Sequence, residues 1–159
     1  MKTLVIYYSL EGNTKLIAET IAKTANADIL ELKTIKEYPT GGFKKYLWGG
    51  KSVMFNQKPE LVEINVDIAA YDRIFIGTPI WVGTYAPPFS TFIEKYNIEN
   101  KKIALFACHG GGGGEKFYNK FKSKLPNNEY IGEIDFQDPI KTDTEKSLIK
   151  VKEWVNELK

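Results

Sequence analysis

Residues 9–14 combine hydroxyl groups, a glycine and a following helical pattern in a way that could bind an anion. Ser9 and Thr14 stand at the two ends of the segment, and Gly12 allows a tight turn between them. The N-terminus of a helix presents unpaired N–H groups and the positive end of its dipole, which together attract a phosphate. An ordinary capped turn between a strand and a helix explains the same residues, so both interpretations stay open here.

A second segment whose side chains could do chemistry is residues 108–114, where Cys108 and His109 directly precede the glycines of residues 110–114. A thiol and an imidazole could act as nucleophile and base. Adjacent residues on a glycine loop seldom reach the geometry of such a pair, however, and no carboxylate is evident that would orient the imidazole. We therefore assign no catalytic residue. We also assign no metal site, because one cysteine and one histidine provide no cluster of ligands.

The elements that must position these segments are buried strands. Three continuous apolar runs, at residues 4–8, 74–76 and 103–107, are typical of strands that are covered on both faces. Each run ends in a polar or glycine-rich segment, and a helical pattern follows each one. This alternation of strand and helix predicts an α/β fold built on a doubly wound parallel sheet.

Two weaker patterns predict further strands. Residues 29–32 follow the first helical pattern, and residues 130–136 precede the last one. Simple alternation in the second pattern places Tyr130, Ile134 and Phe136 on one face, as in an edge strand.

The chain is predicted to form a single domain over residues 1–159, with a long insertion at about residues 36–63. Glycines and prolines punctuate this insertion, which we expect to hold a short helix between long loops. It could cover the sheet or lie over a site.

The last helix is predicted to begin at Thr142, which has the spacing of a capping box with Glu145.

Composition excludes several classes of function. The net charge is +2, from 22 basic and 20 acidic residues, and Arg73 is the single arginine, so a nucleic-acid partner is not expected. No apolar run approaches the ~18–20 residues of a membrane span. No secretory signal is evident, and we expect a cytoplasmic protein without a membrane partner. ATP and dinucleotides are disfavoured, because Lys45 stands where a P-loop needs its first glycine and no G-x-G-x-x-G follows the first strand.

Three loops in the same order make the chain resemble the flavodoxins, and more closely the flavodoxin-like FMN proteins of bacteria. Residues 9–14 are similar to the family's T/S-x-T-G-x-T loop, which wraps the FMN phosphate. Residues 77–88 resemble the segment beside the isoalloxazine ring, and residues 71–76 resemble the strand before it. Residues 108–114 resemble the glycine-rich turn at the pyrimidine edge of the flavin.

The resemblance implies a three-layer α/β fold with five parallel strands in the order 2-1-3-4-5 and FMN as cofactor. In it, Trp81 could lie over the flavin, with Tyr85 a less certain second candidate, although a loop aromatic packed on a neighbouring helix explains Trp81 as well. His109 is a candidate proton donor. The cofactor-binding residues implied are Ser9, Leu10, Glu11, Gly12, Asn13, Thr14, Thr78, Pro79, Ile80, Trp81, Val82, Gly83, Tyr85, Cys108, His109, Gly110 and Gly111.

Two features depart from the family pattern. Glu11 stands where the family often has threonine, so we expect it to act through its backbone N–H, with the carboxylate turned to solvent. The near-neutral net charge also differs from that of the strongly acidic electron carriers of the family.

The leading function implied by the resemblance is electron transfer between redox protein partners. The alternative is an NAD(P)H-dependent quinone or FMN reductase acting on a small quinone or nicotinamide substrate; a third class is a non-catalytic FMN-binding module.

Overall fold

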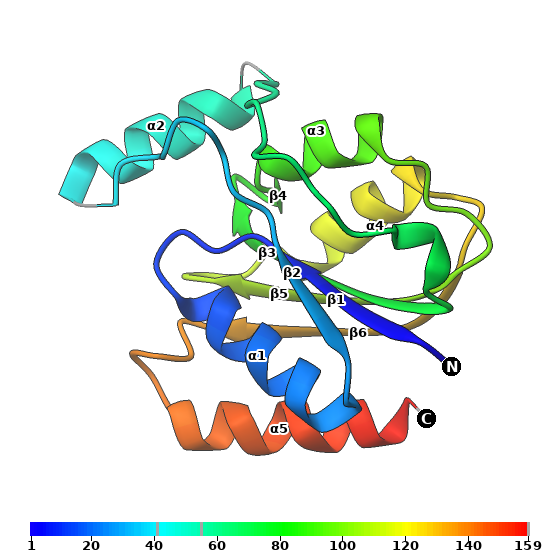
Figure 1. Cartoon of the computed structure of the whole chain (residues 1–159). Coiled ribbons are helices and arrows are strands. Elements are labelled where there is room, and N and C mark those ends of the chain that lie inside the picture. Colours follow the sequence, from blue (N-terminus) through cyan, green and yellow to red (C-terminus); the bar gives the residue numbers. More distant parts are fainter. Residues whose placement is uncertain (41, 55, 159) are drawn as a thin grey trace.

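The computed structural model describes residues 1–40, 42–54 and 56–158, and a parallel sheet lies at its centre (Figure 1). The sheet has the order β2-β1-β3-β5-β6, with β4 paired antiparallel to the end of β3. Because β4 lies off this path, the parallel strands have the predicted order 2-1-3-4-5, which confirms the fold class. The strands are β1 (Thr3–Tyr7), β2 (Asp28–Glu31), β3 (Arg73–Trp81), β4 (Thr84–Tyr85), β5 (Lys102–His109) and β6 (Glu129–Gln137).

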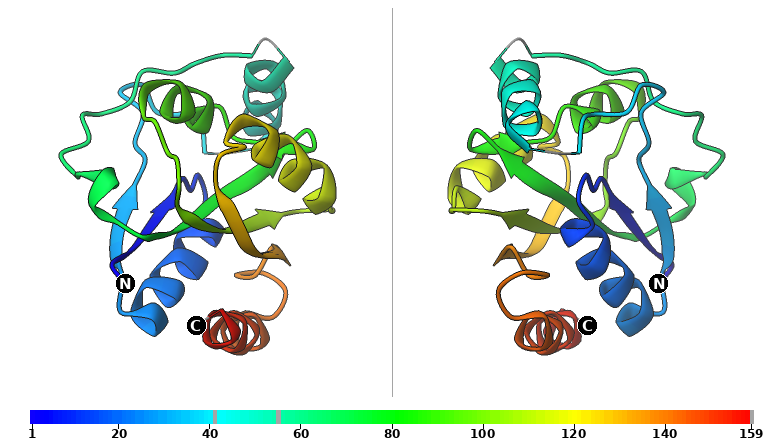
Figure 2. Two further views of the ribbon diagram at one scale, coloured as in Figure 1. Left: turned by 90° about the vertical axis from the view of Figure 1, so that its right-hand side faces the viewer. Right: turned by 90° about the vertical axis from the view of Figure 1, so that its left-hand side faces the viewer.

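Helices cover both faces of the sheet and make the outer two of three layers. In Figure 2 one layer holds α1 and α5, and α3 and α4 lie on the other side of the sheet. None of the helices in the described part of the chain has the length and hydropathy that a bilayer crossing requires. The helices are α1 (Asn13–Ala25), α2 (Gly42–Met54), α3 (Pro88–Lys95), α4 (Gly114–Lys124), α5 (Thr144–Glu157) and the short 3-10 helix η1 (Ile68–Ala70).

Each central strand contributes side chains to two separate cores. In β1, Leu4 and Ile6 belong to one core, whereas Val5 and Tyr7 belong to the other. All four side chains are almost fully buried. Burial on both faces explains why the apolar runs in the sequence are continuous.

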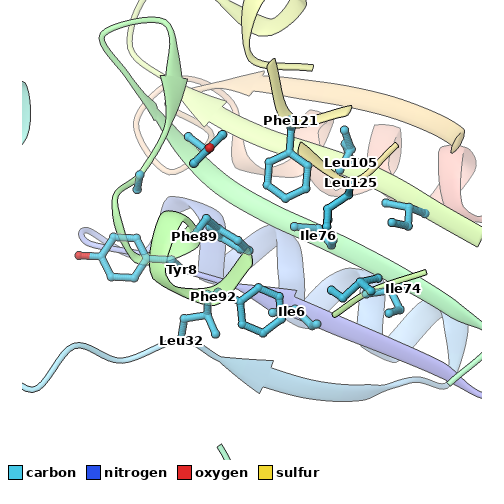
Figure 3. Close-up of a cluster of buried hydrophobic side chains, with 14 of the residues drawn as sticks. Ile6, Tyr8, Leu32, Ile74, Ile76, Phe89, Phe92, Leu105, Phe121 and Leu125 are labelled. Carbon is cyan, nitrogen blue, oxygen red and sulfur yellow. The ribbon is translucent and has the colours of Figure 1, made fainter. Parts of the chain in front are cut away.

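Aromatic side chains fill the core on the side of α3 and α4. Figure 3 shows Ile76 of β3 facing the rings of Phe89 and Phe121, which come from α3 and α4. These two rings lie 5.8 Å apart in an edge-to-face arrangement. Such pairs favour close packing of the two helices on the sheet.

Strand β6 contains a bulge that the sequence pattern did not reveal. The pairing with β5 skips Ile131, so that the alternation of faces reverses between Tyr130 and Gly132. Tyr130 consequently packs against the core on the side of α3 and α4, whereas Ile134 and Phe136 belong to the other core. The prediction that these three residues share one face is therefore wrong.

The N-cap of the last helix lies one residue later than predicted, and the helix itself begins at Thr144. Asp143 is its N-cap, and its Oδ1 accepts a hydrogen bond of 2.9 Å from the N–H of Lys146. The hydroxyl of Thr142 instead donates to the carbonyl oxygen of Gln137, 2.8 Å away. Thr142 therefore closes the loop before the helix, and the predicted capping box is absent.

Helix α2 lies within the predicted insertion and stands out from the rest of the molecule (Figure 1). It meets the body at Gly49, where an added Cβ would lie 3.5 Å from the Trp81 ring. This is an ordinary van der Waals distance, so the backbone of α2 lies close to the Trp81 ring. Residues 41 and 55 of the insertion lie outside the described part of the chain.

A close approach between β3 and β5 yields a test of the fold. Gly77 pairs with Phe106, and a Cβ at Gly77 would run into the buried Phe106 ring. We expect Gly77→Ala to lower the free energy of unfolding by about 2–3 kcal/mol, the usual cost of overpacking. The matched control is Gly111→Ala, because nothing lies within 4 Å of its added Cβ. Urea unfolding should show a change within about 0.5 kcal/mol for the control; equal losses for both variants would contradict this packing.

Candidate functional site

A crevice of about 130 Å³ lies where β1, β3 and β5 end. The chain runs from β1 to β2 on one side and returns to β3 on the other, so the strand order reverses at this point. Ligands of open α/β sheets bind at such reversals, beyond the carboxyl ends of the strands. The crevice is lined by Ser9, Leu10, Glu11, Asn13, Thr14, Pro79, Ile80, Trp81, Cys108, His109, Gly110, Asp138 and Lys141.

The first loop leaves the N-terminus of α1 open towards the crevice. Gly12 is the N-cap with φ of 94°, a left-handed conformation that favours glycine, and no side chain caps the helix. Its N–H donates to the hydroxyl oxygen of Ser9 at 3.1 Å, which fixes the turn. The N–H groups of the first helical turn can therefore bind an anion.

The loop between β6 and α5 braces the site from a distant part of the sequence. The N–H of Ile140 donates to Oδ1 of Asn13 at 3.0 Å, and the N–H of Asp138 donates to the carbonyl oxygen of His109 at 2.9 Å. These bonds join the first loop to the third. The first of them also engages the side-chain oxygen of Asn13, whose backbone N–H belongs to the uncapped first turn of α1.

Sequence reasoning missed two residues of the crevice, Asp138 and Lys141. The position of their loop in the sequence could have indicated them. The carboxyl ends of all parallel strands meet at one edge of the sheet, and the loop with Asp138 and Lys141 follows the last strand, β6. Lys141 brings a positive charge to the crevice, whereas Asp138 and Glu11 bring carboxylates. The Glu11 side chain is exposed, as expected for a carboxylate turned to solvent.

The second loop contributes an aromatic wall. The Trp81 ring packs edge-on against Tyr38, with centroids 5.5 Å apart, and against Tyr8, with centroids 6.0 Å apart. Burial raises the pKa of the Tyr8 phenol above its ordinary value, so this ring stays neutral. Trp81 thus lines the crevice while three neighbours, Gly49 among them, hold it in place.

Six predicted site residues do not line the crevice. The Thr78 hydroxyl accepts from the N–H of Ala86 and donates to a carbonyl, each at 3.0 Å, and so anchors the segment before α3. The Tyr85 ring is buried 5.3 Å from the Phe121 ring. The others form turns: Gly12 shapes the first loop, Val82 and Gly83 form the β3–β4 hairpin turn, and Gly111 lies in the third loop.

His109 shapes the third loop with both nitrogens of its imidazole. Nδ1 accepts a hydrogen bond of 2.7 Å from the N–H of Gly112, and Nε2 lies 3.5 Å from Oδ1 of Asp135. Gly112 and Gly113 have φ of 103° and 99°, which side chains rarely adopt. Asp135 is thus a carboxylate that can orient the imidazole, although none was evident in the sequence.

Cys108 and His109 do not form a nucleophile–base pair, because successive residues of a strand point to opposite faces. Cys108 lies in the core beneath α1 and α5, whereas His109 turns towards Asp135. Burial raises the pKa of the Cys108 thiol to about 12, despite a hydrogen bond from Thr14 that lowers it. The thiol is therefore protonated at neutral pH.

Because the Cys108 thiol is buried and protonated, we predict that it reacts slowly with thiol reagents in the folded protein. We expect an aromatic disulfide reagent to modify Cys108 in the folded protein at least about 100-fold more slowly than in urea-unfolded protein. Raising the pH from about 7 to about 9 should accelerate both reactions, because the thiolate fraction rises in each, but only the unfolded reaction should level off as the pH passes the ordinary thiol pKa of about 8.5. Absorbance of the released thiolate measures both rates. A folded protein that reacts as fast as the unfolded one, and levels off at the same pH, would instead reveal an accessible nucleophile.

Comparisons with known proteins agree with this geometry. The family model described as "Flavodoxin" matches residues 2–158. The flavodoxin-like domain-containing protein BilS of Clostridioides difficile (strain CD3) is 34% identical over 145 residues, which cover 88% of this chain and 68% of that protein.

Solved structures are similar as well. A flavoprotein of Lactobacillus acidophilus NCFM, crystallised in complex with FMN, shares 27% identity with a TM-score of 0.73, covering 91% of this chain and 98% of the other. A flavoprotein of Bacteroides uniformis ATCC 8492, at 23% identity, shares the fold with a TM-score of 0.82, covering 98% and 97%. With the family model matched over nearly its whole length, the chain belongs to the flavodoxin family.

Proposed function

We propose that this protein carries electrons between redox protein partners through FMN bound in the crevice. That it is a flavodoxin-like, FMN-binding flavoprotein follows from its family. The observation that supports the proposal is the convergence of three loops, from the ends of β1, β3 and β5, on one crevice with an anion site and an aromatic wall. Flavins exchange one or two electrons, and this is the chemistry that bound FMN would supply.

The donor set of the first loop fits the phosphate of FMN. The uncapped turn of α1 offers N–H groups and the positive end of a helix dipole. Ser9 and Thr14, which both carry hydroxyls, are among the residues that line the crevice, and Lys141 adds a cation. Together these groups would hold a phosphate dianion by charge-assisted hydrogen bonds.

The other two loops fit the flavin ring. Trp81 and Ile80 provide apolar surface that excludes water from one side of the crevice. Gly110 lines the crevice; its C=O accepts from the Gln137 side chain and the N–H of Gly112 donates to His109, so the other backbone groups of this loop are the ones that would hydrogen-bond the polar edge of a flavin. Because His109 and Asp135 fix this loop, its backbone groups are held in position before a ligand arrives.

A second candidate function, an NAD(P)H-dependent quinone or FMN reductase, is favoured by a separate groove. The groove has a volume of about 760 Å³, which is ample for a small quinone. Tyr38 lines it and also packs against Trp81, so the groove lies behind the aromatic wall of the crevice. Its lining residues are Ile35, Lys36, Glu37, Tyr38, Pro39, Lys44, Trp48, Gln57, Pro59 and Glu60.

Reduction of the FMN-loaded protein separates the two functions. The protein is incubated with FMN, freed of excess flavin and titrated with reductant at controlled potential. An electron carrier should take up its two electrons in two resolved steps and oxidise NAD(P)H only at a background rate. A reductase should show a single two-electron step and rapid NAD(P)H oxidation once a quinone is added. Failure to retain flavin absorbance would overturn both functions.

The charges of the crevice predict opposite effects of two substitutions on FMN affinity. Glu11→Gln should lower the dissociation constant of FMN about threefold, because it removes repulsion from the phosphate. Lys141→Gln should raise it about threefold, because it removes an attraction of similar size near the surface. Both effects should shrink as salt is added. Quenching of flavin fluorescence measures the constants.

Riboflavin provides the control for these two variants, because it has the flavin ring but lacks the phosphate. Its dissociation constant should be the same in wild type and in both variants. Equal changes for FMN and riboflavin would place Glu11 and Lys141 near the ring rather than at the phosphate.

A further inference from the structure

Helix α2 exposes an unusual row of side chains to solvent. Leu47, Trp48 and Met54 are 56%, 48% and 77% exposed, which is high for large apolar residues. Lys44 and Lys51 are exposed as well. Their spacing of three or four residues places all five on one side of the helix. We call these five residues the α2 face.

The surroundings of the α2 face are basic. Residues 38–59 contain four lysines and no aspartate or glutamate. Beyond the β3–β4 hairpin the positive charge continues on α4, where the Lys116 side chain lies 3.1 Å from a Cβ added at Gly83. Among the described residues, Glu94 pairs with one of these lysines, Lys58, at 2.8 Å, and Glu37 and Glu60 line the groove beside α2.

The α2 face adjoins the crevice through one packing contact. Gly49, on the inner side of α2, lies against the Trp81 ring, and Trp81 lines the crevice. Figure 1 shows α2 standing out next to β4, at the end of the sheet where the crevice lies. A protein bound to the α2 face would therefore lie one helix diameter, ~10 Å, from the Trp81 wall of the crevice.

We propose that the α2 face is the docking surface for a redox partner whose own surface is acidic around an apolar patch. This inference rests on the proposed electron-transfer function and names the partner's chemistry. The lysines would attract and orient the partner, and burial of Trp48 and Leu47 would supply binding energy. In each encounter one electron leaves the partner's cofactor and enters the flavin, or passes in the reverse direction.

The test uses a reduced, acidic plant-type [2Fe–2S] ferredoxin as the partner and the FMN-loaded protein as the acceptor. Ferredoxins of this type have potentials of about −400 mV and can donate single electrons. Stopped-flow absorbance measures the rate of flavin reduction. We expect this rate to fall between about 0.02 M and about 0.3 M NaCl, because salt screens the attraction. At low salt, Lys44→Glu/Lys51→Glu should slow it about tenfold.

A matched variant controls for net charge. Lys23→Glu/Lys152→Glu makes the same change in charge on α1 and α5, which lie on the opposite side of the sheet. This variant should slow the reaction less than twofold. Trp48→Ala should weaken equilibrium binding of oxidised ferredoxin, measured by calorimetry, about fivefold or more. Calorimetry needs no electron transfer and so reports on docking alone.

Each remaining outcome is decisive. Equal losses in the two charge variants, or no loss in either, would overturn the α2 face as a docking surface. Sedimentation with vesicles that contain phosphatidylserine, lost in Lys44→Glu/Lys51→Glu, combined with no ferredoxin binding, would overturn it in favour of a lipid surface. Flavin that resists reduction even by dithionite would instead refute the proposed function, while the calorimetric result for docking would still stand.

Discussion

The constraint on which the rest of the structure depends is the burial of both faces of the central strands. Side chains of β1, β3 and β5 enter one of two cores, so charged or reactive groups find little room along these strands. Such groups are left to the ends of the strands, where the chain turns into helices. Because the strands are parallel, these ends meet at one edge. The crevice is a consequence of how the sheet is covered, and the loops supply its chemistry.

Within that frame, the alternation of a strand decides what two neighbouring residues can do together. Cys108 and His109 are adjacent in sequence, yet the sheet separates their side chains. The thiol becomes part of the core, and the imidazole becomes a brace for the glycine loop. A loop of glycines needs such a brace to hold one conformation, since glycines alone are free to adopt many.

The sequence was a good guide to features that depend on local pattern. Continuous apolar runs predicted the central strands, and glycines and hydroxyls after them predicted most of the crevice. Features that depend on contacts between segments far apart in the sequence were not predicted. The bulge at Ile131 follows from pairing with β5, and Lys141 enters the crevice because Ile140 bonds to Asn13. The place of α2 beside Trp81 involves a contact between Gly49 and the indole ring that no periodicity reveals. Each of these needs knowledge of which segments meet.

The hydrogen bond between Ile140 and Asn13 joins residues 127 positions apart. A contact of this span closes a loop that contains most of the chain, and its loop-closure entropy is a cost that local contacts do not carry. The brace of the first loop therefore exists only in molecules in which β6 and the loop after it are in place. A ligand held in the complete crevice would bind such molecules in preference to partly folded forms, and so would stabilise the whole fold.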